Sequence, residues 1–132
     1  MTRYLVDTSV WSLSFRRESQ ENVKDLMAEL IVANQVELIG SIRQEVLSGI
    51  SDDSAFQTLQ SKLSVFPDLP ISSEDYIKAA YFYNQCRSKG VQGSHTDFLI
   101  VSVAYRYGLT VLTADKDFLH FARFLPLEVR IV

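Results

Sequence analysis

Short hydrophobic runs alternate along this chain with segments in which hydrophobic positions recur every three or four residues. The short runs predict strands at residues 3–6, 36–39, 110–113 and 127–132. The periodic segments predict helices at 8–17, from 21 to about 31, 41–47, from 52 or 53 to 63, 73–88, 97–107 and 117–124. Alternation of this kind is typical of a parallel sheet covered by helices on both faces. We therefore expect an α/β fold, a parallel-sheet α/β/α sandwich, with residues 1–132 forming a single domain.

Two local patterns add detail to the predicted helices. The second helix has an apolar stripe that points to the core, made of Val23, Leu26, Met27, Leu30 and Ile31. The Ser-x-x-Gln sequence from Ser41 to Gln44 resembles a capping box, which predicts that Ser41 starts the next helix.

Composition narrows the class of protein. The chain has 132 residues, of which 47% are hydrophobic and 22% charged, as expected for one folded domain. One cysteine and two histidines are too few for a disulfide framework or a zinc centre. The first residues lack the apolar run of a signal peptide, and no apolar stretch reaches the roughly 20 residues that span a bilayer. We expect a cytoplasmic protein with no membrane contact.

The net charge of −3 argues against a sequence-independent DNA-binding protein, which usually carries an excess of basic residues. If the five acidic residues described in the next paragraph all belong to one metal site, however, the remaining charged residues are slightly more basic than acidic. The charge balance is therefore compatible with a nucleic-acid substrate without indicating one.

Acidic residues follow the predicted strands or begin the predicted helices. They are Asp7, Glu45, Asp97, Asp115 and Asp117. Each has an ordinary explanation as a helix cap, a helix-dipole partner or a solvated side chain. However, ligands of an open parallel sheet bind at the carboxyl ends of the strands, where these acids are expected to meet. Carboxylates crowded there repel one another unless a cation binds, and an all-oxygen set favours Mg²⁺ or Mn²⁺.

Four motifs in this order resemble the PIN domain, and above all the VapC-type toxins of toxin–antitoxin pairs. The motifs are Leu5-Val6-Asp7-Thr8-Ser9, the isolated Glu45, Thr96-Asp97 before an apolar helix, and Leu112-Thr113-Ala114-Asp115-Lys116-Asp117. The resemblance implies an Mg²⁺- or Mn²⁺-dependent endoribonuclease. It makes Asp7, Glu45, Asp97 and Asp115 the metal-binding quartet, with Asp117 as an auxiliary acid. Thr8 or Ser9, and Thr113, then match hydroxyl positions that support the carboxylates or the scissile phosphate.

The same resemblance implies partners. A VapC-type toxin is held inactive by a cognate VapB-type antitoxin and usually forms a homodimer, for which the aromatic-rich predicted helix 73–88 offers apolar surface. Three basic residues near the predicted site could meet RNA phosphates: Arg43, Lys116 and Arg123.

Other functions remain open from the sequence alone. An Asp-nucleophile phosphatase of the haloacid-dehalogenase type also places Asp after its first strand, but it needs a second Asp where this chain has Ser9. A phosphorylation receiver domain needs two adjacent acids there. A PIN fold that has lost its activity could serve as an RNA- or protein-binding module, although such a module has no need of crowded carboxylates.

Overall fold

The computed structural model describes residues 1–16 and 21–132, and its centre is a parallel sheet. Within these residues the strands are β1 (Tyr4–Val6), β2 (Val36–Glu37), β3 (Thr110–Thr113) and β4 (Val129–Ile131). Their order across the sheet is β2-β1-β3-β4, and all neighbours are parallel. The chain leaves β1 toward β2 on one side and later returns to β3 on the other. The order thus reverses between β1 and β3, where a parallel sheet opens a crevice for ligands.

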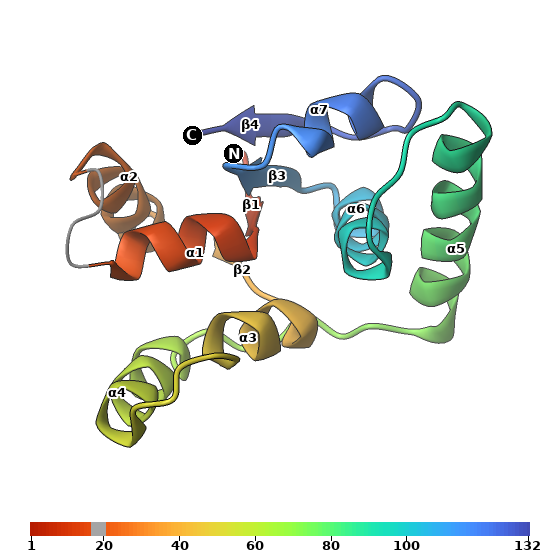
Figure 1. Cartoon of the computed structure of the whole chain (residues 1–132). Coiled ribbons are helices and arrows are strands. Elements are labelled where there is room, and N and C mark those ends of the chain that lie inside the picture. The colour runs from red at the N-terminus through yellow and green to blue at the C-terminus, as the bar shows by residue number, and fades with distance from the viewer. Residues whose placement is uncertain (17–20) are drawn as a thin grey trace.

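Helices lie on both sides of this sheet, which confirms the expected fold class (Figure 1). The described helices are α1 (Thr8–Phe15), α2 (Glu21–Val32), α3 (Gly40–Leu47), α4 (Asp53–Leu63), α5 (Ser73–Ser88), α6 (His95–Tyr107) and α7 (Asp117–Ala122). Helices α1 and α2 lie on one side of the strands and α5 and α6 on the other (Figure 1). In the part of the chain that the structure describes, no helix is both long and apolar enough to cross a membrane.

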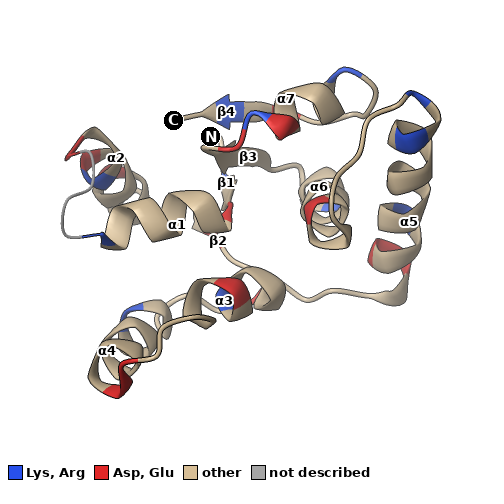
Figure 2. Ribbon diagram, viewed as in Figure 1, with Lys and Arg blue, Asp and Glu red and all other residues tan. Residues whose placement is uncertain are grey.

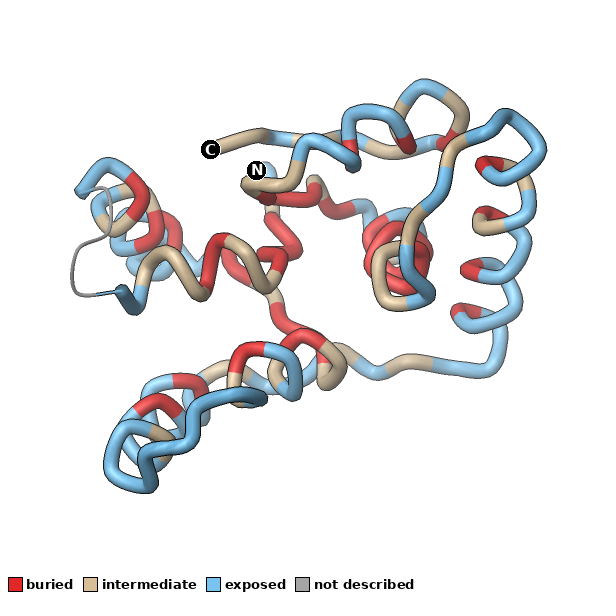
Figure 3. Tube along the Cα trace, viewed as in Figure 1, coloured by how far each residue is buried: buried red, intermediate tan, exposed pale blue. Residues whose placement is uncertain are grey.

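The core is built around β1, β3 and α6. Every residue from Phe98 to Ala104 in α6 is buried, as are the apolar residues of β1 and β3 (Figure 3). Burial all round is expected for a helix enclosed between a sheet and a second helix, here β3 and α5. The rigid core therefore fixes both the strand ends and the first turn of α6.

Two local predictions differ from the structure, and a third cannot be compared with it. Ser41 does not cap α3: the helix begins at Gly40, the capping position is Ile39, and no side chain caps it. Ile39 is fully buried, so packing of the strand-to-helix turn determines where the helix begins. Ile31 is 40% exposed because it lies at the outer edge of the α2 stripe, whose centre is Val23, Met27 and Leu30. The end predicted for the first helix, Arg17, lies outside the described residues.

Candidate functional site

Asp7 lies at the end of β1, at the point where the strand order reverses. It occupies the capping position of α1, yet its side chain makes no capping hydrogen bond. The residue is only 7% exposed. Its Oδ2 instead accepts hydrogen bonds from Ser9 Oγ and from Thr113 Oγ1, both at 2.8 Å. The side chain is therefore held for a purpose other than helix capping.

The same two hydroxyls join the turn after β1 to the turn after β3. Ser9 Oγ accepts from the backbone N–H of Ala114 at 3.0 Å, and Thr113 Oγ1 accepts from the N–H of Asp115 at 3.0 Å. Asp115 in turn accepts a hydrogen bond from the N–H of Asp117 at 2.9 Å. One network therefore orients Asp7 and sets the backbone that carries Asp115.

Asp97 is fixed by a capping box at the start of α6. Its Oδ2 accepts from the Ser94 N–H at 3.0 Å, while the Asp97 N–H donates to Ser94 Oγ, also at 3.0 Å. Burial raises the pKa of Asp97 above its ordinary value, and the charges of Asp7 and Asp115 raise it further, whereas hydrogen bonding of the carboxylate to the backbone and side chain of Ser94 lowers it. Asp97 is therefore close enough to both acids to feel their charge.

Glu45 approaches the group from α3. Its side chain is on the exposed side of the helix, yet partial burial raises its pKa, and the charges of Asp7 and Asp97 add to the increase. The neighbouring Thr8 hydroxyl acts in the opposite direction by favouring the charged form. The α3 helix thus brings Glu45 within electrostatic reach of residues on two other elements.

The structure brings four of the five candidate acids into one electrostatic group. Asp7, Glu45, Asp97 and Asp115 come from separate parts of the chain, and their acidic segments surround the same central region in Figure 2. Asp117 differs, because its side chain is exposed and does not contribute to the pKa shifts of Glu45 or Asp97. It lies at the edge of the group, two residues after Asp115.

The donors around this group fit a hydrated hard cation. Among residues 1–16 and 21–132, no three acidic, histidine or cysteine side chains are placed to hold one ion on their own. Mg²⁺ usually takes only one or two carboxylates and keeps several waters. The buried hydroxyl oxygen of Ser41 meets no hydrogen-bonding partner in the described chain, whereas that of Thr8 interacts with Glu45. Ser41 precedes Glu45 by one helical turn, so its hydroxyl could bind the water shell of an ion.

The basic residues predicted to meet RNA fall into two classes. Arg43 is tied into the fold: it donates to Asp68 at 3.0 Å and to the carbonyl oxygens of Leu63 and Phe66. A guanidinium used in this way has little freedom to bind a phosphate, so the prediction for Arg43 is not supported. Lys116 and Arg123 are exposed at the two ends of α7, where substrate could reach them.

Two positions important to the site were not recognised from the sequence. Ser94 forms the capping box with Asp97, and its Ser-x-x-Asp spacing before an apolar run is a readable signal. Gly93 packs directly on α7: a Cβ there would lie 2.5 Å from Phe121 Cζ and 3.0 Å from Phe98 Cε2. This contact depends on tertiary packing, so no local sequence pattern could reveal it.

Comparison with known proteins places the chain in a family. The PIN domain matches residues 4–124. Ribonuclease VapC11 of Mycobacterium tuberculosis is 32% identical over 129 residues, which cover 94% of this chain and 95% of the relative. Two solved structures share the fold, each with a TM-score of 0.79: FitAcB from Neisseria gonorrhoeae and VapBC2 from Rickettsia felis bound to a promoter DNA fragment. They are 23% and 18% identical, and cover 96% and 99% of this chain and 95% and 99% of their own. With this extent of match, the chain belongs to the PIN domain family.

Proposed function

We propose that the protein is a metal-dependent endoribonuclease toxin that hydrolyses phosphodiester bonds of RNA. The observation that carries the proposal is the mutual influence of Asp7, Glu45, Asp97 and Asp115 at the carboxyl ends of β1 and β3. The relative at 32% identity is described as a ribonuclease. Carboxylates gathered in this way suit phosphate chemistry when a bound metal ion neutralises their charge.

The proposed metal-binding residues are Asp7 and Asp97, with Glu45 and Asp115 acting through water. Bound Mg²⁺ or Mn²⁺ would neutralise charge on the scissile phosphate and activate a water molecule for attack. Ser9 and Thr113 hold Asp7 through its Oδ2, which leaves Oδ1 facing no hydrogen-bond donor within the described residues. The buried Ser41 hydroxyl, which has no partner in the described chain, is proposed to hydrogen-bond to water bound around the ion.

The capping box also orients the carboxylate of Asp97 toward the proposed metal site. Because Ser94 occupies only Oδ2 of the carboxylate, the box sets the direction of the side chain and leaves Oδ1 for the ion. Asp117 is proposed as an auxiliary acid at the edge of the site, where its exposed side chain could bind water or a metal on entry.

The proposed partners follow from the relatives. The Rickettsia felis neighbour is a VapBC complex, so we expect a VapB-type antitoxin to cover this site and inhibit it. A homodimer is also proposed, with exposed aromatic residues such as Tyr81 and Tyr105 as available apolar surface. We also propose that the protein acts in the cytoplasm, where it would meet its RNA substrate. One sheet and one continuous core support a single domain over residues 1–132.

A catalytically inactive PIN module is the main alternative. Its observable difference is metal affinity, since a binding module does not require the acids to hold an ion. An Asp-nucleophile phosphatase has less support, because Ser9 stands at the position of its second acid and is hydrogen-bonded to Asp7.

The direct experiment is to incubate the purified protein with total cellular RNA, in Mn²⁺ or in EDTA, and to map new 5′ ends. We expect discrete cleavage sites that appear only with the metal and are lost in Asp97→Asn. The Asn side chain can still accept the Ser94 hydrogen bond, so loss of cleavage would reflect the charge and not the fold. Cleavage retained in Asp97→Asn, or absent from the wild type with metal and without antitoxin, would contradict the proposal.

A further inference from the structure

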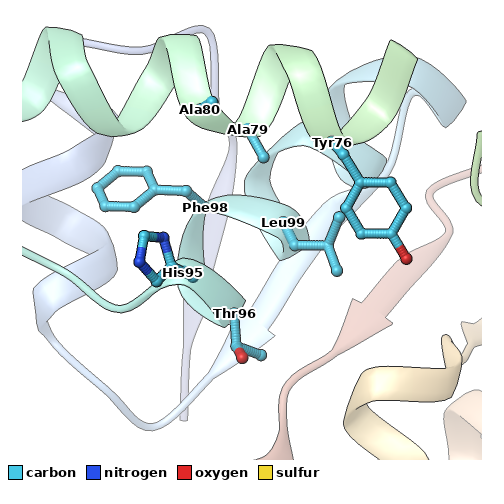
Figure 4. A pocket seen from close by; sticks show the side chains of 7 residues that line it. All are labelled: Tyr76, Ala79, Ala80, His95, Thr96, Phe98 and Leu99. Carbon is cyan, nitrogen blue, oxygen red and sulfur yellow. The ribbon is translucent and has the colours of Figure 1, made fainter. Parts of the chain in front are cut away.

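A small pocket lies between α5 and the first turns of α6, on the side of α6 away from the sheet (Figure 4). Its volume is about 220 Å³, and it is lined on α5 by Tyr76, Ala79 and Ala80 and on α6 chiefly by His95, Thr96 and Leu99. The pocket is smaller than the roughly 300–1,000 Å³ of a site for a drug-sized ligand. A single planar ring is therefore a more suitable occupant than an extended molecule.

The spacing of residues on α5 creates this pocket. Tyr76, Ala79, Ala80 and Tyr83 recur at intervals that place them on one face of the helix. The two alanine methyl groups leave a gap between α5 and α6. Tyr76 lines this gap, and Tyr83 packs against two other lining residues, His95 and Phe98. The walls formed by Ala79 and Leu99 are buried, whereas Tyr76 at the rim is 57% exposed.

Polar groups at the rim are held in fixed positions. The His95 ring stacks on Tyr83, with ring centroids 5.1 Å apart and an angle of 16° between the planes. Stacking orients the imidazole nitrogens, which can donate or accept hydrogen bonds according to the tautomer. Thr96, the next residue along α6, lines the same pocket (Figure 4). An apolar slot with such a rim can hold the faces of a flat heterocycle and bind its polar edge.

The pocket lies close to the carboxylate group. Asp97 is in the same first turn of α6, and at about 100° per residue it points to the opposite side of the helix from His95 and Leu99. A helix with its side chains is about 10–12 Å wide. A nucleic-acid strand that crosses the end of α6 could therefore present a phosphate to Asp97 and, one or two nucleotides away, a base to the pocket.

We propose that this pocket binds one unpaired nucleobase of the RNA substrate, next to the bond that is cleaved. The inference rests on the ribonuclease function proposed above and adds a residue-level basis for sequence preference. Proteins that recognise single-stranded RNA commonly stack splayed bases on tyrosine or histidine and bind their edges with polar groups. Tyr76 offers the exposed ring face, and His95 and Thr96 offer the edge contacts.

The first test uses free nucleotides, so that it does not depend on cleavage. We would titrate each of the four nucleoside 5′-monophosphates into ¹⁵N-labelled protein and follow the amide signals of Ala80 and Thr96 by NMR. We expect saturable shifts at both signals with at least one nucleotide. In Ala80→Leu, which fills the pocket from an exposed position, the affinity should fall at least tenfold. The control is Ala28→Leu, which places the same side chain on an exposed site of α2. No shift, or equal affinity in both variants, would overturn the proposal.

The second test uses oligonucleotides that the protein cleaves, with one base at a time replaced by an abasic residue. Removal of the pocketed base should lower kcat/KM about 5- to 100-fold, as for loss of one stacked base. In Ala80→Leu, removal of the base at that position should no longer lower kcat/KM, whereas removal of the other bases should have the same effect as in the wild type. The proposal would be contradicted if kcat/KM fell by the same factor at every abasic position. It would also be contradicted if sedimentation showed that the main effect of Ala80→Leu is dissociation of a dimer. If the wild type binds nucleotides but cleaves no RNA, the pocket proposal stands and the ribonuclease function is rejected. If it cleaves RNA but binds no nucleotide in the pocket, the ribonuclease function stands and the pocket proposal is rejected.

Discussion

Thr113 Oγ1 donates a hydrogen bond to Asp7 Oδ2 across a distance of 2.8 Å and 106 residues of sequence. Both residues are buried, and they end the two strands between which the order of the sheet reverses. The same hydroxyl accepts from the backbone N–H of Asp115. A single threonine therefore links the orientation of one proposed metal-binding acid to the placement of another.

The substitution Thr113→Val tests the hydrogen bonds of Thr113 without changing how the side chain packs, because valine has the shape of threonine but no hydroxyl. We expect Mn²⁺ affinity and RNA cleavage to fall about 10- to 100-fold, the usual effect of removing a hydrogen bond that orients a metal ligand. Calorimetry and initial cleavage rates measure the two effects. Thr110→Val, at the start of the same strand, is the matched control and should change neither. Equal behaviour of the two variants would remove Thr113 from the site.

The raised pKa of Asp97 predicts how pH affects the metal-free protein. The ordinary pKa is 3.8, and burial with the charges of Asp7 and Asp115 raises it in the folded state. The folded protein thus binds this proton more tightly than the unfolded chain, so the stability that it contributes at low pH is lost as pH rises through the raised pKa. In EDTA, the free energy of unfolding of the wild type should decline relative to that of Asp97→Asn as the pH rises above the ordinary pKa of 3.8 and through the raised pKa. Urea titrations measure this difference, and a difference that stays constant or grows with pH would contradict the assignment.

Gly93 should tolerate no larger residue, because a Cβ would lie 2.5 Å from the Phe121 ring. Gly93→Ala is expected to lower the free energy of unfolding by about 1–3 kcal/mol, as overpacking does in a dense core. Gly40→Ala is the control, since its Cβ would come no closer than 3.6 Å to Asp68. Thermal or urea unfolding compares the two, and a neutral Gly93→Ala would show that the loop before α6 moves freely.

The basic residues should also separate into structural and substrate-binding groups. Arg43→Ala should lower stability, because it breaks contacts with Asp68 and two backbone carbonyl oxygens. Lys116→Ala should leave stability unchanged and reduce the salt dependence of RNA binding, with a slope smaller by about 0.7 for one lost phosphate contact. Binding measured over a series of salt concentrations tests the second effect. An unchanged slope would exclude Lys116 from the RNA-binding surface.

Element types and many boundaries were predictable because strong periodicity and clear end signals coincide. The helix from Ser73 to Ser88 and the strand from Thr110 to Thr113 have the predicted bounds, and Gly108 ends α6 in a left-handed conformation. Capping motifs predicted the starts of helices less well than periodicity predicted the helices, because packing can place the first residue of a helix elsewhere. Ser41 has the motif and does not cap, whereas Ser94 caps α6, which begins at His95 and not at the predicted residue 97.

The candidate acids could be proposed from their positions after strands or near the starts of helices, but their spatial relationships could not. Which strands are neighbours depends on packing between distant segments, so the sequence could not pair Thr113 with Asp7 or bring Glu45 near Asp97. The structural role of Arg43 has the same origin, because its partners Leu63, Phe66 and Asp68 lie 20 to 25 residues away.

The most direct test of the metal-dependent site is a calorimetric titration of Mn²⁺ into the wild type, Asp7→Asn and Asp75→Asn. Asp75 is a matched control, since this acid is also buried, at 3% exposed, but pairs with Arg106 on the far side of α6. We predict one saturable binding event in the wild type and in Asp75→Asn, and its loss in Asp7→Asn. Equal Mn²⁺ affinity in Asp7→Asn and the wild type would contradict the account.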